Sequence, residues 1–513
     1  MVMSTLIGGF LDSFSKYREK RALSFYRNGR KETDITYGQL DLDSNRVARG
    51  LLDMGVAKGD RVILFMPKSL FFVVVHMAIQ KIGAITVPLN PQFKEAEMRY
   101  FINDADPRLI VCGRAQEPMI SQLASDRQVL VVDTDVPYQE LDRFAHLSDQ
   151  GVLENLTPDD PALIIYTSGT TGKPKGAVLT HRNLVHDAYN VIHVWEINAT
   201  DVICHALPLF HVHGLCFAFH TALLAGAGVV MLDQFRPQHV IERLAVRRGE
   251  QSCSVFMAVP VMYVRMLDYL GKSKPDFTHI RLWASGSAPL LPKDFHRIRD
   301  VFGKEPVERE GMTETGMNFS NPLYGKRKPG SVGIPLPDLE VRIVDPRTQR
   351  DVPFGEVGEI WLRGPSITPG YWRKPEETKQ AFVDGWFRTG DLGRVDEDGY
   401  FYITDRIKHI IISGGENISP KEIENIINQL PEVLESCVVG VPDDKWGEKV
   451  AAAVVLRAGG AVEPEDIDRH CKKFLHDWKC PKEILIVKGL PKNTMGKVMK
   501  EEVIKMFQAK DTS

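Results

Sequence analysis

The chain has 513 residues, more than one ordinary hydrophobic core requires, and we expect two or more domains. Its net charge of −3 argues against a dedicated nucleic-acid-binding protein, and 43% hydrophobic with 26% charged residues is ordinary for a globular protein. Seven scattered cysteines lack the spacing of a metal site or a disulfide framework, which predicts a reducing compartment.

Targeting signals are not evident in the chain. No apolar run is long enough to span a membrane, and the N-terminal residues are too polar for a secretory signal. The last four residues, Lys510 to Ser513, do not match a peroxisomal address. We therefore expect a cytoplasmic protein without a transmembrane segment.

The first third of the chain alternates short apolar runs with helical patterns. Strands are predicted at residues 61–65 and 84–89, with a helix at 70–82 between them, and further strands at 108–111 and 129–132. Such alternation is typical of an α/β fold in which helices cover parallel sheets.

A loop of unusual composition follows a predicted strand at residues 162–165. Residues 166–176 read YTSGTTGKPKG. Glycines let the backbone approach an anion closely, successive N–H groups can surround it, and lysines add charge, so the loop predicts a site for a nucleotide triphosphate. It is not a Walker A motif, because only two residues separate Gly169 from Gly172 and Pro174 follows Lys173.

The pattern of apolar and polar residues changes toward the C-terminus. Short alternating runs at residues 341–344 and 359–362 predict a small antiparallel β unit. A helix from about Pro420 and strands at 436–441 and 450–455 predict a separate α+β module. We predict a domain of residues 1–404 and a second of residues 405–513.

The loop sequence TSGTTGKPKG is similar to the phosphate loop of the AMP-forming acyl-CoA synthetases, a superfamily shared with peptide-synthetase adenylation domains and firefly luciferase. Four further segments match family motifs in the expected order, and the resemblance covers essentially the whole chain: residues 311–314, 389–391, 405–408 and 493–497. It implies a large N-terminal domain that binds ATP and the acid, and a mobile small C-terminal domain that carries an essential lysine.

The resemblance implies an ATP-dependent ligase that works in two half-reactions. A carboxylate attacks the α-phosphorus of ATP to give acyl-AMP and pyrophosphate, and the thiol of coenzyme A then takes the acyl group and releases AMP. The first step brings two anions together, so their charge must be neutralised. The expected ligands are a small carboxylic acid, ATP, Mg²⁺ and coenzyme A.

Residue roles follow from the resemblance, motif by motif. The expected phosphate-loop residues are Thr167, Ser168, Gly169, Thr170, Thr171, Gly172 and Lys175. The expected adenine and ribose contacts are Ser287, Ala288, Pro289, Asp391 and Arg406. Lys408 resembles the hinge between the domains, and Gly414 and Gly415 resemble the loop that admits the pantetheine thiol. A turn residue is the alternative for Asp391, as a hairpin turn is for the two glycines.

Three further residues are expected to serve adenylation itself. The resemblance makes Glu314 the Mg²⁺ ligand, Thr313 a contact of the α-phosphate, and Lys497 the cation that bridges carboxylate and phosphate. A helix N-terminus with Thr313 as its cap is the alternative for the first two. The chain departs from the family at Glu310, where an aromatic residue usually stacks on adenine, and at His409.

The acid is predicted less narrowly than the reaction. His211 matches a family position where a histidine can donate to the substrate carboxylate, although a satisfied core histidine is the alternative for it and for His213. Residues 317–322 and Arg281 resemble malonyl-CoA synthetases, and an arginine in the acyl pocket would bind a distal carboxylate. Malonate or another short dicarboxylate is therefore the narrow prediction, with a fatty or aryl monocarboxylate nearly equal.

Three other functions are alternatives to the ligase. Acyl transfer to a carrier-protein thiol, luciferase-type oxidation and a non-enzymatic nucleotide sensor are the alternatives. No carrier domain is evident, and the presence of both Glu314 and Lys497 speaks against a sensor.

Overall fold

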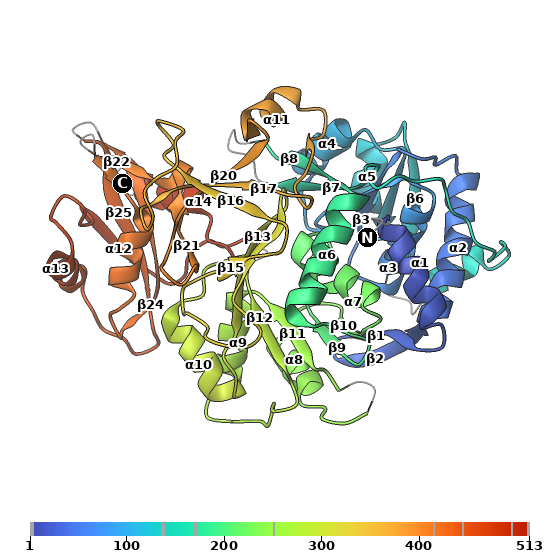
Figure 1. The fold of residues 1–513 in the computed structure, drawn as a ribbon, viewed down its shortest axis with the longest axis horizontal. Coiled ribbons are helices and arrows are strands. Elements are labelled where there is room, and N and C mark those ends of the chain that lie inside the picture. Colours follow the sequence, from blue (N-terminus) through green and yellow to red (C-terminus); the bar gives the residue numbers. More distant parts are fainter. Residues whose placement is uncertain are drawn as a thin grey trace. The chain divides into compact units, whose positions relative to one another are not determined.

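The computed structural model describes residues 5–134, 139–167, 173–249, 252–413, 416–443, 446–493 and 496–509 (Figure 1). The chain groups into two compact units. The larger unit holds Met1–Glu340 and Leu362–Phe387, and the smaller unit holds Val341–Trp361 and Arg388–Ser513. The domain boundary predicted at residues 404/405 stays a prediction.

The first sheet of the larger unit has seven strands in the order β18-β8-β7-β4-β3-β5-β6. β3 pairs in parallel with both β4 and β5, and only β7–β8 and β8–β18 are antiparallel among the pairings of this sheet that the structure describes. Its strands are β3 Arg61–Phe65, β4 Ile85–Pro88, β5 Leu109–Gly113, β6 Gln128–Val132, β7 Pro161–Thr167, β8 Lys175–Thr180 and β18 Gly370–Tyr371.

The second sheet of the larger unit has nine strands in the order β15-β14-β13-β12-β11-β9-β10-β1-β2. The strands from β13 through β12, β11, β9 and β10 to β1 are parallel, whereas β13–β14 is an antiparallel hairpin. Its strands are β1 Arg21–Arg27, β2 Arg30–Thr36, β9 Val202–His205, β10 Gly228–Leu232, β11 Val255–Ala258, β12 Leu282–Ser285, β13 Val307–Met312, β14 Gly316–Ser320 and β15 Ile334–Pro335.

Helices cover these sheets, and their starts are encoded locally. Ser69 begins α3 by accepting a hydrogen bond from the Phe72 amide, and proline occupies the first turn of α8, α9 and α10, where no N–H donor is needed. In Figure 1, α1, α2 and α3 lie together, as do α8, α9 and α10. The helices are α1 Leu6–Lys16, α2 Tyr37–Asp53, α3 Leu70–Lys81, α4 Glu95–Ala105, α5 Glu117–Leu123, η1 Gln139–Phe144, α6 His181–Trp195, η2 His213–His220, α7 Thr221–Leu224, α8 Pro237–Leu244, α9 Pro260–Leu270, α10 Pro292–Phe302 and α11 Pro375–Ala381.

Two smaller sheets follow in the chain. The first has the order β16-β17-β20-β19, and β21 pairs with β20; the second has the order β23-β22-β25-β24, and β26 pairs with β25. The remaining elements are β16 Glu340–Val344, β17 Gly358–Arg363, β19 Phe382–Val383, β20 Trp386–Val395, β21 Phe401–Arg406, η3 Ile407–His409, β22 Ile411–Ser413, β23 Glu416–Ile418, α12 Pro420–Ile427, β24 Val433–Asp443, β25 Gly447–Leu456, α13 Pro464–Phe474, β26 Glu483–Val487 and α14 Lys500–Gln508.

Both faces of the β24–β25 ribbon are buried. Val438, Ala452 and Val454 enter one apolar cluster, whereas Cys437 and Ala453 enter another. Successive side chains of a strand point to opposite faces, so the near-continuous apolar run of β25 builds two cores at once.

The predicted fold class is confirmed: helix-covered parallel sheets form the larger unit, and a small α+β unit follows. The strand predicted at residues 61–65 is reproduced residue for residue, and the helix predicted at 70–82 ends one residue earlier. Within the part of the chain that the structure describes, no helix is both long and apolar enough to cross a membrane.

Candidate active site

The predicted site residues that follow strands of the nine-stranded sheet gather at one edge of that sheet. β9, β11, β12 and β13 are parallel, so their carboxyl ends meet at the same edge. Ser287 follows β12, while Thr313 and Glu314 follow β13. In α/β proteins, ligands bind outside the carboxyl ends of parallel strands, and this edge is therefore the candidate site.

Glu314 lies in the turn between β13 and β14 and is 7% exposed. Its Oε1 atom accepts hydrogen bonds from the Thr167 hydroxyl at 3.3 Å and from the Tyr371 hydroxyl at 3.1 Å. The fold thus joins Glu314 to the residue that ends β7. The alternative of a helix N-terminus with Thr313 as its cap is wrong, because both residues belong to a β-turn.

Tyr371 is a site residue that the sequence did not single out. Burial raises the pKa of its hydroxyl, and the neighbouring Glu314 raises that pKa further, so the hydroxyl stays protonated and donates to the carboxylate. The Lys175 amine lies 5.2 Å from the centroid of the Tyr371 ring. The only local signal was an aromatic residue beside a glycine, which is common in turns and edge strands.

The phosphate loop lies at the limit of what the structure describes. Ser168, Gly169, Thr170, Thr171 and Gly172 are outside the described residues, and their role stays a prediction. Residues 173–175, which follow directly, line a cavity of about 190 Å³ together with Tyr100, Lys374 and Glu377. Lysines at this position suit an anionic ligand.

The donor set around Glu314 fits Mg²⁺ held jointly with a nucleotide. A carboxylate is a hard oxygen ligand, and Mg²⁺ commonly takes one or two carboxylates together with phosphate oxygens and water. Among the described residues, no group of three or more His, Cys, Asp or Glu side chains is arranged to hold a metal ion. The arrangement is thus unlike a site built from protein ligands alone.

Two histidines that follow β9 differ in their hydrogen bonding: His211 precedes η2, and His213 begins it. His213 is 2% exposed, and its Nδ1 lies 3.1 Å from the hydroxyl of Ser287, whose φ of 69° is unusual for a residue with a side chain. The Nε2 atom of His211 is buried and has no hydrogen-bond partner among the described residues. Burial lowers the pKa of His211 to about 4, so its ring is neutral at pH 7.

Arg309 on β13 is a buried cation that the sequence did not reveal. It is 3% exposed, and within the described part of the chain its Nε, Nη1 and Nη2 atoms have no hydrogen-bond partner. Its guanidinium lies 4.9 Å from the Phe217 ring centroid, and a Cβ on Gly286 would come within 2.5 Å of its Nε. Burial lowers its pKa to about 10, while Glu310 and Asp187 raise it. An arginine beside the Gly-Met-Thr-Glu motif, inside a strand, was the available signal.

Glu310 has a partner on the neighbouring strand. The Asn318 side-chain amide on β14 donates to the Glu310 carboxylate at 3.0 Å. Asn318 belongs to residues 317–322, the segment that resembles malonyl-CoA synthetases. The carboxylate at the usual adenine-stacking position is therefore held by a residue of that segment.

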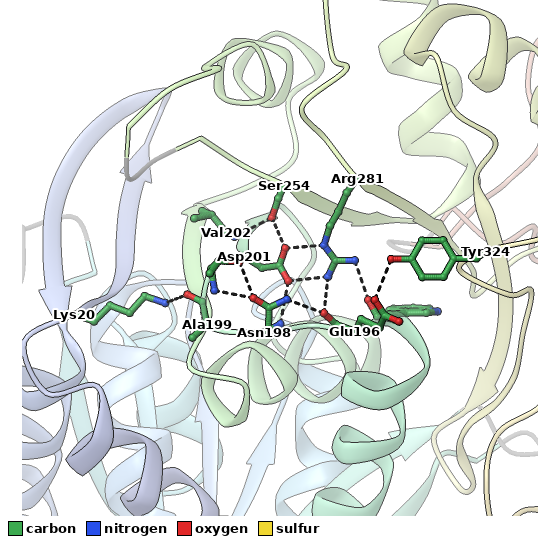
Figure 2. A network of polar contacts seen from close by, with 11 residues as sticks. Lys20, Glu196, Asn198, Ala199, Asp201, Val202, Ser254, Arg281 and Tyr324 are labelled. Carbon is green, nitrogen blue, oxygen red and sulfur yellow. Dashed lines mark hydrogen bonds and ion pairs between the residues drawn. The ribbon is translucent and has the colours of Figure 1, made fainter.

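Arg281 is not available to a substrate (Figure 2). Its Nε and Nη2 atoms donate to the two Asp201 carboxylate oxygens at 2.8 and 2.7 Å, and it also donates to the backbone oxygens of Trp195 and Glu196. Arg281 also precedes β12, whereas Ser285 ends it, so the two lie at opposite edges of the sheet. The prediction that Arg281 binds a distal carboxylate is wrong.

The predicted ribose residues meet in the smaller unit. Asp391 on β20 pairs with Arg406 on β21, and the Arg406 Nε lies 2.6 Å from the Asp391 Oδ1. Burial raises the pKa of Asp391, whereas Arg406 and Lys497 lower it. The buried Glu359 accepts a hydrogen bond from the Gly390 amide at 3.2 Å and thereby fixes the backbone just before Asp391.

Lys497 follows a turn in which the Asn493 side chain accepts its backbone N–H at 2.9 Å. Loss of hydration, together with the charges of Arg406 and Lys408 and against that of Asp391, lowers the pKa of Lys497 to about 8. These effects place the amine near the ribose residues of the same unit.

The predicted hinge and its surroundings are mainly basic. Lys408 and His409 lie in η3, and burial lowers the pKa of both side chains, that of His409 to about 3. Gly414 and Gly415 are outside the described residues. β22 and β23 on either side of them pair antiparallel, as in a hairpin, and the predicted role of the two glycines toward coenzyme A stays a prediction.

Comparison with known families matches both parts of the chain. The AMP-binding enzyme family matches residues 10–372, and the C-terminal domain of AMP-binding enzymes matches residues 422–497.

Relatives extend over almost the full chain. The mouse mitochondrial malonate–CoA ligase ACSF3 (Mus musculus) is 39% identical over 88% of this chain and 83% of its own length. An oxalate–CoA ligase of Arabidopsis thaliana is 34% identical over 99% of both chains, and a long-chain-fatty-acid–CoA ligase of Bacillus subtilis is 31% identical over 98% of this chain and 94% of its own. The crystal structure of ATP-bound MatB from Rhodopseudomonas palustris superposes with a TM-score of 0.92 at 36% identity, covering 98% of this chain and 99% of MatB.

The family match, the fold and the relatives agree on a reaction class that uses ATP. This chain belongs to the AMP-binding enzymes and, among them, to the AMP-forming acyl-CoA synthetases, which are acid–thiol ligases.

Proposed function

We propose that this ligase activates malonate or another short dicarboxylic acid as its acyl-adenylate and transfers the acyl group to coenzyme A. The observation that supports a dicarboxylic acid as the substrate is the buried Arg309 guanidinium, which has no hydrogen-bond partner among the described residues. Its carboxylate-binding fork would face the free end of a dicarboxylate while the other end is activated.

Arg309 favours an acid with a second charge because a buried guanidinium without hydrogen bonds is costly. A carboxylate would supply two charge-assisted hydrogen bonds and offset that desolvation. A fatty or aryl monocarboxylate, the alternative acid, would leave the guanidinium unpaired against apolar carbon. The names of the malonate and oxalate ligases support the dicarboxylate, whereas that of the fatty-acid ligase supports the alternative.

In the adenylation step, an oxygen of the acid forms a bond to the α-phosphorus of ATP, and the bond to the pyrophosphate oxygen breaks. Glu314 would hold Mg²⁺, which supplies charge neutralisation of the phosphates when bound. The neutral His211 would donate its Nε2–H to the acid, and Thr313 would contact the α-phosphate. Lys497 would place its positive charge between the two reacting anions.

The nucleotide and thiol would be held by the remaining predicted residues. The phosphate loop with Lys175 would bind the polyphosphate, residues 287–289 the adenine, and Asp391 with Arg406 the ribose. In the second step the thiol sulfur bonds to the acyl carbon and AMP leaves with the bonding electrons. Lys408 would serve as the hinge between the two steps, and Gly414 with Gly415 would admit the thiol.

Two further points stay predictions. The acyl acceptor is proposed to be coenzyme A, with a carrier-protein thiol as the alternative. The cytoplasm remains the expected compartment, although the mouse relative is named mitochondrial.

The test measures pyrophosphate release with ATP, Mg²⁺ and coenzyme A across malonate, succinate, butyrate and benzoate. We expect malonate to be used best. Substitution of Arg309→Met should lower kcat/KM for malonate by about 30-fold or more, because truncating one partner of a buried ion pair costs about 2–5 kcal/mol. Butyrate, which has no second carboxylate, should be affected far less.

Arg281→Lys is the matched control, since that residue pairs with Asp201 and not with the acid. It should leave the malonate-to-butyrate ratio unchanged. Equal losses with both acids in Arg309→Met would contradict the dicarboxylate assignment, and no pyrophosphate release with any acid would contradict the reaction itself.

A further inference from the structure

Lys68 and His205 connect the two sheets of the larger unit at their carboxyl edges. Lys68 lies three residues after β3 of the seven-stranded sheet, and His205 ends β9 of the nine-stranded sheet. The Lys68 amine lies 3.0 Å from the His205 Nδ1 and donates to the backbone oxygens of His205 at 3.1 Å and of Leu207 at 2.9 Å. The three N–H donors of an ammonium group thus meet three acceptors.

The other nitrogen of His205 fixes its tautomer. Its Nε2 lies 2.8 Å from the Gly214 carbonyl oxygen, which can only accept, so Nε2 carries the proton and Nδ1 accepts from Lys68. Burial, together with the charge of Lys68, lowers the pKa of His205 to about 3, so the ring is neutral. Lys68, His205 and Gly214 therefore form one directed chain of hydrogen bonds.

These hydrogen bonds hold both ends of residues 207–214, the segment that contains His211 and His213. Lys68 binds the first end at Leu207, and His205 binds the last end at Gly214. The bend between them is tight, because a Cβ on Gly214 would lie 2.0 Å from the Pro208 carbonyl oxygen.

We propose that Lys68 and His205 are positioning residues that hold residues 207–214 in the conformation that binds the acid. The inference rests on the proposed function, in which His211 donates to the substrate carboxylate. Lys68 does not contact the substrate; it acts through the imidazole of His205 and the backbone of the segment. A misplaced His211 weakens binding of the acid while leaving the nucleotide-binding residues of the phosphate loop in place.

The charge of Lys68 makes this relay of hydrogen bonds, from Lys68 through His205 to Gly214, sensitive to pH. Burial lowers the pKa of Lys68 to about 7, although the charges of Asp233 and Cys204 act to raise it. The neighbouring His205 is neutral and adds no charge. A neutral amine has only two N–H donors, so one of its three acceptors loses its bond above that pH. Affinity for the acid should therefore weaken as the pH rises through about 7.

The experiment compares Lys68→Met, Lys68→Arg, His205→Ala and His205→Gln with the full-length wild-type enzyme. In Lys68→Met, KM for the acid should rise about tenfold or more, the range expected for lost hydrogen bonds to a charged group, while KM for ATP stays within about twofold. His205→Gln, whose amide has both a donor and an acceptor, should recover part of the loss seen in His205→Ala. Lys58→Met, a change at an exposed lysine that bonds the Asn155 carbonyl oxygen, is the control.

The pH profile separates positioning from a merely structural role. In the wild type, KM for the acid should rise above about pH 7, whereas Lys68→Arg, which stays charged, should lack that rise. Equal increases of both KM values in Lys68→Met, or the same alkaline rise in Lys68→Arg, would overturn the proposal.

A measurement without substrate distinguishes failure of the relay from failure of the proposed function. With ¹⁵N-labelled histidine, the His205 ring should show a protonated Nε2 in the wild type and a changed Nδ1 shift in Lys68→Met. A protonated Nδ1 in the wild type would overturn the relay even if malonate is turned over. Lack of turnover with every acid would remove the proposed function and leave the ring assignment standing.

Discussion

At Lys497, the chain holds a cation whose charge is easily lost. Loss of hydration and the nearby Arg406 and Lys408 lower its pKa to about 8. A lysine near its neutral form still offers a compact positive charge at pH 7, and its flexible stem suits a transient role between two anions. The same surroundings make that role dependent on pH.

We predict that Lys497→Ala blocks acyl-AMP formation but still converts pre-made acyl-AMP and coenzyme A to thioester. In the wild type, the adenylation rate should fall as the pH rises through about 8, since the charged fraction of Lys497 falls there. Single-turnover assays of the two half-reactions provide the measurement. Equal loss of both half-reactions would refute the role of Lys497.

Arg281 and Arg309 show how neighbouring structure decides the use of one residue type. Arg281 is engaged by Asp201 and two backbone oxygens, so its charge is satisfied within the protein. Arg309 stacks near Phe217 and has no hydrogen-bond partner among the described residues. The first stabilises the amino edge of the sheet, and the second is the residue that we propose pairs with the acid.

At the scale of elements, the β13–β14 hairpin presents Glu314 and is anchored to α6. The Asp187 carboxylate on α6 accepts the Met317 backbone N–H at 2.7 Å. Gly316 has a φ of 77°, and a Cβ there would lie 2.6 Å from the Asp187 Oδ1. The turn therefore requires glycine both for its backbone conformation and for its close approach to α6.

We predict that Gly316→Ala destabilises the protein by about 1–3 kcal/mol more than Gly303→Ala. Gly303 has a similar φ of 80° and open space where its Cβ would be, so the comparison cancels the backbone cost and leaves the clash with Asp187. Urea unfolding of both variants gives the difference. Equal destabilisation would show that α6 does not constrain the hairpin.

At the scale of the whole molecule, an unusual number of histidines is buried and neutral. Burial strongly lowers the pKa of seven of them, to about 3 for three, to about 4 for two and well below the ordinary value for the other two: His76, His205, His409, His181, His211, His213 and His220. In the unfolded chain, histidine takes up a proton below about pH 6.5. The unfolded state therefore binds more protons than the folded state between about pH 4 and 6.5.

We predict that the free energy of unfolding decreases as the pH falls from 6.5 toward 4. Three buried carboxyls act in the opposite direction: burial raises the pKa of Asp187 to about 7, that of Glu308 to about 8 and also that of Asp391, so the stability they contribute is lost as the pH rises. Seven histidines against three carboxyls set the expected sign.

Urea midpoints at pH 7 and pH 5 check this expectation. His76→Gln removes one titrating group and should reduce the slope with pH, whereas a change at an exposed lysine such as Lys272→Met should not. A midpoint that is higher at pH 5 than at pH 7 in the wild type would contradict the prediction.

The sequence by itself determined the reaction class and much of the element layout. Runs such as residues 62–65 are apolar over the length of a strand. Such a continuous apolar run indicates a strand that is buried on both faces of a parallel sheet. The phosphate loop was recognisable because its glycines, hydroxyls and lysines are adjacent in the chain. Such signals are local and need no knowledge of which strands pair.

The tertiary structure alone decided which distant residues share the site. Thr167 and Tyr371 reach Glu314 from 147 and 57 residues away, and Lys68 reaches His205 across 137 residues. Local patterns report which face of a strand is buried, but not which strand ends meet or which cations find a partner. For that reason the sequence does not distinguish Arg281 from Arg309, since only strand order and side-chain pairing separate an arginine whose hydrogen bonds are satisfied within the protein from one whose hydrogen bonds are not.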